Sequence, residues 1–247
     1  MLGLMAGALP AALLFAPARW LAAGVAQATS GQVQLVQARG TVWNGSAQLV
    51  LAGGAGSNDR AALPGRMDWE LRPAWGGAVA RLRMDCCMAA PARVQVAAGW
   101  GSARVSVQDS ESHWPAAVLS GLGTPWNTVQ PQGRLALQTR GLQVAWAAGR
   151  AVVAGQVQID ALAVSSRLST LRPMGSYRVT VQGGDAPTLT LSTLEGALRL
   201  SGSGQWVGQR LRFTGEASAA PDREAALANL LNIIGRRNGA RSIITVG

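Results

Sequence analysis

Residues 176–218 read SYRVTVQGGDAPTLTLSTLEGALRLSGSGQWVGQRLRFTGEAS, and this stretch indicates the fold most clearly. Polar and apolar residues alternate within YRVTV, TLTL and RLRF, and turn-forming residues such as Gly183-Gly184-Asp185 separate the runs. A period of two residues is typical of strands that have one buried face and one wet face. The stretch therefore predicts antiparallel strands joined by short turns.

The same alternation extends through most of the preceding chain. In TVWNGSAQLVLAGG, Asn44 and Gly45 stand between two alternating runs, which is the strongest short-range signal of a β-hairpin. Comparable runs are QVQLVQARG, RMDWELRP, AVARLRMD, ARVQVAAG, ARVSVQD, GRLALQTRG, LQVAWAAG, AVVAGQVQID and ALAVSSRLS. A meander of this length cannot remain flat without exposing its edges. We therefore predict a mainly β fold, in which an antiparallel β-meander curls into a half-pipe, a partial barrel or a sandwich.

Two helices are expected to interrupt the strands. Residues 114–119 predict one short mid-chain helix, because Pro115 lies near its first position and Gly121 ends it. A C-terminal amphipathic helix is predicted after Pro221, with acids in its first turn that suit the helix dipole. Its apolar stripe has a helical period and consists of Leu227, Leu230, Leu231 and Ile234. We expect this helix to cap the open end of the sheet.

The N-terminus predicts a single-pass transmembrane helix that anchors the chain over residues 1–28. Residues 1–18 carry no charged side chain, and the apolar character resumes after Arg19 and Trp20, which we expect at the membrane interface. No Lys or Arg precedes the segment, so we hypothesise that the anchor is N-terminally truncated. The alternative is a signal peptide cleaved after Ala26-Gln27-Ala28. Either interpretation places residues 29–247 in the bacterial periplasm as a β-rich domain.

The charge of the chain comes from arginine alone. All 22 basic residues are arginines, and the 12 acids leave a formal net charge of +10. One explanation is the codon usage of a GC-rich genome, and the other is a surface suited to anionic partners such as lipid head groups. Nucleic acid is not expected as a partner, because the arginines are spread singly along the strands and the N-terminus indicates export.

The sequence offers little of what catalysis requires. His113 is the only histidine and lies in the polar run DSESHWP, where a loop or helix-capping role is expected instead of a general base. Histidines, cysteines and carboxylates lack the spacing of metal ligands, and the glycines form no phosphate-binding loop. We therefore expect no enzyme activity, no cofactor and no metal.

Cys86 and Cys87 are adjacent and are the only cysteines. Two thiols in an oxidising periplasm usually pair, but neighbouring cysteines can do so only through a strained ring. Three states stay open. They are a vicinal disulfide that locks a turn, two reduced buried thiols, and pairing between chains.

Several motifs that join a Trp or Tyr to a turn follow one another along the chain. They are FAPARWL at 15–21, GTVWNG at 40–45, GLGTPWN at 121–127, LRPMGSY at 171–177, and a C-terminal stretch from GQW at 204–206 through RF at 212–213 to Leu230-Leu231. By these motifs the whole chain resembles the type II secretion system protein N family. The resemblance implies an inner-membrane protein whose periplasmic domain works with other secretion subunits in the export of folded proteins. It carries over no catalytic residue.

Two non-enzymatic functions follow as hypotheses. The first is an accessory component of the type II protein secretion system that acts as a scaffold or interaction module, with Trp43, Trp126 and Trp206 as partner contacts. Core packing is the alternative role of these tryptophans. The second is a periplasmic lipid- or glycan-binding β-groove protein of AsmA-like kind, with phospholipid as a partner. A continuous apolar groove would favour the second hypothesis, and a filled interior with an exposed sheet edge would favour the first.

Overall fold

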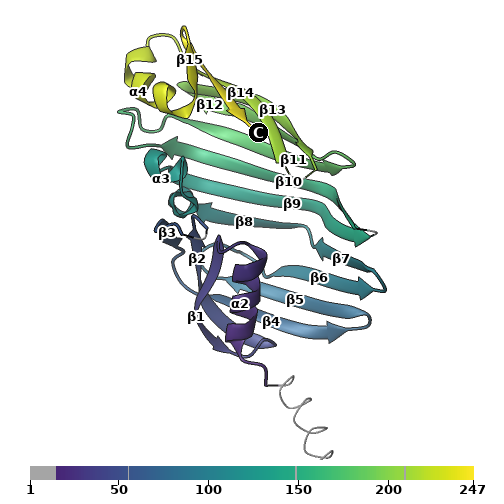
Figure 1. The fold of residues 1–247 in the computed structure, drawn as a ribbon. Coiled ribbons are helices and arrows are strands. Elements are labelled where there is room, and N and C mark those ends of the chain that lie inside the picture. Colours follow the sequence, from purple (N-terminus) through teal and green to yellow (C-terminus); the bar gives the residue numbers. More distant parts are fainter. Residues whose placement is uncertain (1–14, 55, 148, 209) are drawn as a thin grey trace, which may run out of the picture.

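The computed structural model describes residues 15–247 except residues 55, 148 and 209. In this part of the chain, sixteen strands form one antiparallel sheet, roughly in sequence order (Figure 1). Its first half contains β1 (Val33–Gly40), β2 (Asn44–Ala52), β3 (Arg60–Ala62), β4 (Met67–Ala74), β5 (Gly77–Met84), β6 (Ala92–Gly99) and β7 (Ser102–Val107). Its second half contains β8 (Ser110–Pro115), β9 (Gln132–Ala147), β10 (Arg150–Ser165), β11 (Gly175–Gly184), β12 (Thr188–Gly196), β13 (Leu198–Val207), β14 (Arg210–Ala219), β15 (Arg236–Asn238) and β16 (Arg241–Val246).

The strands pair mostly with their neighbours in sequence, because short hairpins connect them. β7 and β8 both pair with β9, β7 along its C-terminal half and β8 along its N-terminal half. The strand order begins at β1 and ends at β15, so the sheet is open. The prediction of a mainly β, antiparallel meander is confirmed, and its form is a single open sheet instead of a two-sheet sandwich.

The first hairpin differs in detail from its prediction. Asn44 and Gly45 do not form the turn but begin β2, and the connection runs through residues 41–43. The indole N–H of Trp69 donates hydrogen bonds to the carbonyls of Thr41 and Val42, at 3.2 and 3.1 Å. A Cβ on Gly45 would lie 2.6 Å from the Trp69 ring. Glycine is therefore needed at this position for close packing, and the turn lies just before it.

The strand register gathers aliphatic side chains on one side of the sheet, which we call the apolar face. Direct cross-strand partners on this face are Val96–Val105–Val144 in one segment and Val157–Val181–Leu189 in the other. The intervening residues form the polar face, where the partners include Gln156–Gln182–Thr188–Gln205–Arg212. This two-sided pattern is what the period of two residues predicts.

Short helices pack against the sheet over three buried clusters. α2 (Ala18–Ala28) covers Leu35, Ala47 and Trp69. The 3-10 helix η1 (Ala116–Leu122) contributes Val118 to a cluster with Leu63, Met84 and Cys87, next to α3 (Trp126–Val129). α4 (Glu224–Ile234) buries Leu227, Leu230 and Leu231 against Met174, Tyr177 and Leu198. The middle cluster joins the two segments of the apolar face, because Trp114 of β8 and Met67 of β4 both pack on it.

The two predicted helices are both present in some form. The C-terminal helix is α4, and its leucines are buried as the apolar stripe predicts. The mid-chain segment begins two residues later than expected, at Ala116, and is a 3-10 helix, because Trp114 and Pro115 still pair with β9 as the end of β8.

The predicted membrane anchor is only partly within the described chain. Residues 1–14 lie outside it, and no helix of the described residues is both long and apolar enough to cross a membrane. Residues 18–28 form α2, which begins after Pro17. Ala18 is buried, and Leu21, Ala22 and Val25 pack against β1 and β2. This part of the predicted anchor therefore packs on the sheet, and a transmembrane helix over residues 1–28 has no support in the described residues.

The sheet has two unlike edges where its strands end. Five hairpins turn at one of them, which we call the tip edge; they connect β4–β5, β6–β7, β9–β10, β11–β12 and β13–β14 (Figure 1, right). The β1–β2 connection is set back from this edge, because Asn44 pairs with Glu70, four residues before the end of β4. The opposite edge, which we call the helix edge, carries η1, α3 and α4 (Figure 1, left).

Candidate functional site

The apolar face is the most extensive candidate surface. Its central residues Val105, Val144, Val157, Val181 and Leu189 are half-buried and belong to none of the three buried clusters. Val96 on the same face is 39% exposed. The helices α2 and α4 pack near the two ends of the strand order, so the middle of the apolar face is left partly accessible.

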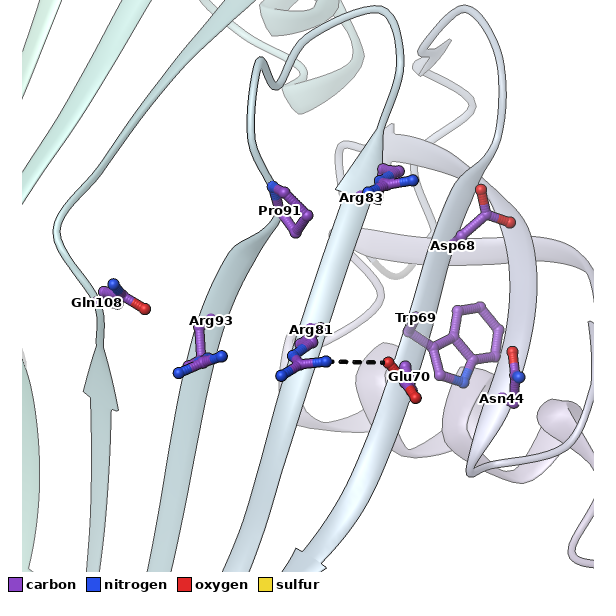
Figure 2. Close-up of a pocket in the computed structure, with 9 residues that line it drawn as sticks. All are labelled: Asn44, Asp68, Trp69, Glu70, Arg81, Arg83, Pro91, Arg93 and Gln108. Atoms are coloured by element: carbon purple, nitrogen blue, oxygen red, sulfur yellow. Dashed lines mark ion pairs between the residues drawn. The ribbon is translucent and has the colours of Figure 1, made fainter.

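A hollow of about 780 Å³ lies on the polar face instead, across β2, β4, β5 and β6 (Figure 2). Its charged lining consists of Asp68, Glu70, Arg81, Arg83 and Arg93. Figure 2 shows Arg81 reaching toward Glu70 from the neighbouring strand, at 3.7 Å between the charged atoms. The hydrogen bond from Arg72, aided by the charges of Arg72 and Arg81, lowers the pKa of Glu70. Such a charged lining suits an anionic group and not an acyl chain.

The three tryptophans predicted as partner contacts lie apart. Trp43 is half-buried in the β1–β2 connection, where its carbonyl accepts a hydrogen bond from the Leu71 N–H at 2.6 Å. Trp126 begins α3 at the helix edge and is 40% exposed. Trp206 is half-buried on β13, one residue pair before its turn, opposite Leu211. The three therefore do not form one site, and their role as contacts stays a prediction.

Three tryptophans that sequence reasoning did not select share the tip edge with Trp206. Trp75 and Trp100 are fully exposed at the first positions of two-residue turns, between β4 and β5 and between β6 and β7. Trp146 is 45% exposed on β9, one residue pair before the turn to β10. The signal that could have found the first two is a tryptophan followed by glycine between alternating runs, as in AWGG and GWG.

Arg19 and Trp20, predicted at a membrane interface, lie in the first turn of α2, and Trp20 is 55% exposed. The residues just before them are tied to the β1–β2 connection. The Val42 N–H donates to the carbonyl of Ala16 at 2.8 Å, and Pro17 forms a bridge with Thr41. The described chain therefore begins beside the β1–β2 connection.

Cys86 and Cys87 are joined by a disulfide in the turn after β5, at the helix edge. Cys87 is buried in the cluster beneath η1, and its carbonyl accepts a hydrogen bond from the His113 N–H at 2.7 Å. Met88 forms a bridge with Ser112. The turn that carries the disulfide therefore contacts β8 along the edge that does not pair with β9.

Other ionisable groups in the sheet stabilise the strand pairing. Arg178 of β11 donates two hydrogen bonds, each of 2.7 Å, to the carboxylate of Asp160 on β10. These bonds hold the pKa of Asp160 below its ordinary value, and they raise the pKa of Arg178. Burial raises the pKa of Tyr177, whose hydroxyl donates to the carbonyl of Leu198 at 3.1 Å. Within the described residues, no three His, Cys, Asp or Glu side chains lie close enough together to hold a metal ion.

Comparison with known proteins identifies the family. The family model described as type II secretion system (T2SS), protein N matches residues 31–244. No curated protein and no solved structure matches the chain. The family match spans nearly all of the sheet and α4, and it agrees with the resemblance drawn from the tryptophan motifs. The chain therefore belongs to the type II secretion system protein N family and is a component of that secretion system.

Proposed function

We propose that this chain is a non-catalytic accessory component of the secretion system, held at the periplasmic side of the inner membrane, and that its apolar face binds the acyl chains of phospholipid. The observation that carries the proposal is the half-buried middle of the apolar face. Aliphatic partners such as Val105 and Val144 lie there without a covering helix among the described elements. A partly exposed apolar surface of this kind marks a binding site in a soluble domain.

The dimensions of the sheet agree with an acyl ligand. Strands spaced about 4.8 Å apart give the path from β1 to β15 a length of about 60 Å. One acyl chain occupies half the hydrocarbon thickness of a bilayer, about 15 Å. The apolar face is therefore long enough for several acyl chains, and the polar face can remain in water.

The proposed location depends on the segment before the described chain. Residues 1–14 are apolar and uncharged in sequence, and the described chain begins after them beside the β1–β2 connection. Membrane attachment by this segment would hold the sheet beside the bilayer, where phospholipid is available. A scaffold that binds protein subunits is the competing function, and the experiment below separates the two.

The test is native mass spectrometry of the full chain extracted from membranes. We expect retained phospholipid in the wild type and its loss in the double variant Val105→Glu/Val181→Glu, which places charge on the apolar face. The matched control is Ser106→Glu/Thr180→Glu, which places the same charges on the adjacent residues of β7 and β11, whose side chains lie on the polar face. Circular dichroism checks that both variants fold. Absence of lipid from the wild type, together with co-purified secretion subunits, would establish the scaffold instead.

A further inference from the structure

We propose that the tip edge rests on the surface of an anionic phospholipid bilayer, with the tryptophans of its turns at the level of the head groups. This inference concerns a different surface from the apolar face, and it stands or falls independently of acyl-chain binding. It rests on the placement of the tryptophans and on the charge of the turns.

The strand register brings four tryptophans that are scattered in sequence to one edge. Trp75 and Trp100 occupy the turns themselves, and Trp146 and Trp206 lie one residue pair before their turns. Successive hairpins are two strands apart, about 10 Å, so the row from Trp75 to Trp206 extends over about 40 Å. At the helix edge, in contrast, Trp126 stands alone among the described residues of η1, α3 and α4.

Full exposure of an indole ring to water is unfavourable, so Trp75 and Trp100 call for a partner surface. Trp has an apolar body and a polar N–H, and it is enriched where hydrocarbon meets water at membrane interfaces. A protein partner is bound through a contiguous, well-packed core of contacts. Single indoles on separate hairpin turns instead suit a soft surface that each ring can enter by itself.

The charge of the turns selects an anionic surface. Arg150 and Arg210 directly follow the β9–β10 and β13–β14 turns, and Arg104 lies two residues after the start of β7. All three are exposed, and none takes part in an ion pair within the described chain. Asp185 is the one acid in the five turns. Arginines near a surface of anionic lipids are attracted to it, and Asp185 offsets only part of this attraction.

The beginning of the described chain lies beside the β1–β2 connection, which turns toward the tip edge but is set back from it by four residues of β4. Ala16 and Pro17 contact the β1–β2 connection, Phe15 is 76% exposed, and Arg19 and Trp20 follow in the first turn of α2. The uncharged residues 1–14 precede this point in the sequence. The tip edge therefore combines exposed indoles and unpaired arginines, which is the composition of a membrane-interface surface.

The test uses the full chain with vesicles that contain brominated phosphatidylglycerol, because bromine quenches tryptophan fluorescence only at close range. We expect quenching in the wild type. The double variant Trp75→Phe/Trp100→Phe should lose about half of the quenched emission, because it removes two of the four tryptophans at this edge. The control Trp126→Phe, at the helix edge, should leave the quenched emission unchanged. Insertion by residues 1–14 does not mask the result, because the readout follows the tip-edge rings themselves.

A second arm tests the charge. Arg150→Glu/Arg210→Glu should reduce quenching in phosphatidylglycerol vesicles, most strongly at low salt, whereas Arg237→Glu at the helix edge should not. Unquenched wild-type emission, or equal losses in the Trp75/Trp100 and Trp126 variants, would overturn the proposal. Loss of a co-purified secretion subunit in the tip variants, without quenching by lipid, would make the edge a protein interface. Quenching that persists in Val105→Glu/Val181→Glu would show that the tip edge works even if acyl-chain binding by the apolar face fails.

Discussion

The tip edge and the helix edge are built from opposite ends of the same strands, yet they differ in how they are stabilised. At the tip edge, turns such as Trp75-Gly76 and Trp100-Gly101 consist of two residues closed by strand pairs, so backbone hydrogen bonds alone hold them. At the helix edge, the connections are longer and fold back as η1 and α4 over buried clusters. Core packing is therefore concentrated at one end of the strands, and large exposed side chains are concentrated at the other end.

This separation has a functional consequence. Residues of the helix edge are constrained by packing, whereas residues of the tip edge contribute little to stability and are free to serve binding. Surface tryptophans that do not stabilise the fold need another reason to be there. The membrane-surface role proposed above supplies one, and the following changes test the comparison itself.

The largest difference in the free energy of unfolding should come from truncating one large side chain at each edge. Leu230 of α4 is 1% exposed, so Leu230→Ala should lower the free energy of unfolding by about 2–5 kcal/mol through lost burial and a cavity. Trp75→Ala removes a larger side chain but should change it by less than about 0.5 kcal/mol, because the indole is fully exposed. Urea unfolding followed by circular dichroism measures both. A comparable loss in the two variants would break the distinction between the edges.

Glycine substitutions should give a smaller but informative contrast. Gly121 in η1 is buried, and a Cβ there would lie 2.6 Å from the Ala61 backbone nitrogen. Gly121→Ala should therefore cost roughly 1–3 kcal/mol through steric overlap. Gly101 in the β6–β7 turn has open space around it but a φ of +70°, so Gly101→Ala should cost only about 1 kcal/mol from the left-handed backbone. Thermal unfolding compares the two, and equal costs would mean that packing at the helix edge is looser than the distances indicate.

Sequence reasoning predicted what depends on local pattern. The alternation in YRVTV and RLRF gave strands with an apolar side, and the leucine stripe at 227–231 gave a helix that covers one end of the sheet. The turn at Asn44-Gly45 was misplaced, because glycine is needed there for close packing within β2: a Cβ would lie 2.6 Å from both the Arg39 carbonyl oxygen and the Trp69 ring, and Trp69 is far away in sequence. Local rules cannot detect such a contact.

The candidate surfaces depend on the register of strand pairing, which local sequence patterns do not predict. Trp75, Trp100 and Trp146 look unrelated along the chain, and only the strand pairing from β4 through β14 shows that they share an edge with Trp206. The N-terminal segment was predicted as one anchor, but the residues after Pro17 pack on β1 and β2 because Ala18 and Leu21 find an apolar surface there. Hydropathy alone does not distinguish a helix that enters a membrane from one that covers a sheet.

A modest pH effect is expected from the Asp160–Arg178 pair, on the half of β10 and β11 nearer the helix edge. The hydrogen bonds from Arg178 lower the pKa of Asp160 in the folded state, so the pair stabilises the protein above the ordinary aspartate pKa of 3.8. This contribution is lost as the pH falls below that value and Asp160 becomes protonated. Asp160→Asn should therefore be less stable than the wild type by up to about 1 kcal/mol at neutral pH, and the difference should shrink toward about pH 2.

The control for this pair is Arg178→Gln, which should remove the same pH dependence from the other side. Chemical unfolding at several pH values measures both single variants and the double variant. If the losses of stability in the two single variants simply add in the double variant, Asp160 and Arg178 do not stabilise the protein as a pair.

The smallest effect on stability should come from the disulfide between Cys86 and Cys87, although it lies at the helix edge. A bond between adjacent residues closes almost no loop, so reduction should change the free energy of unfolding by only a few tenths of a kcal/mol. Mass measurement after alkylation should find no free thiol without reductant and two after reduction. Two alkylated thiols in the untreated protein, or a covalent dimer, would instead identify one of the other two states of this pair. A large loss of stability on reduction would show that the helix edge depends on the locked turn beneath η1 and not on hydrophobic packing alone.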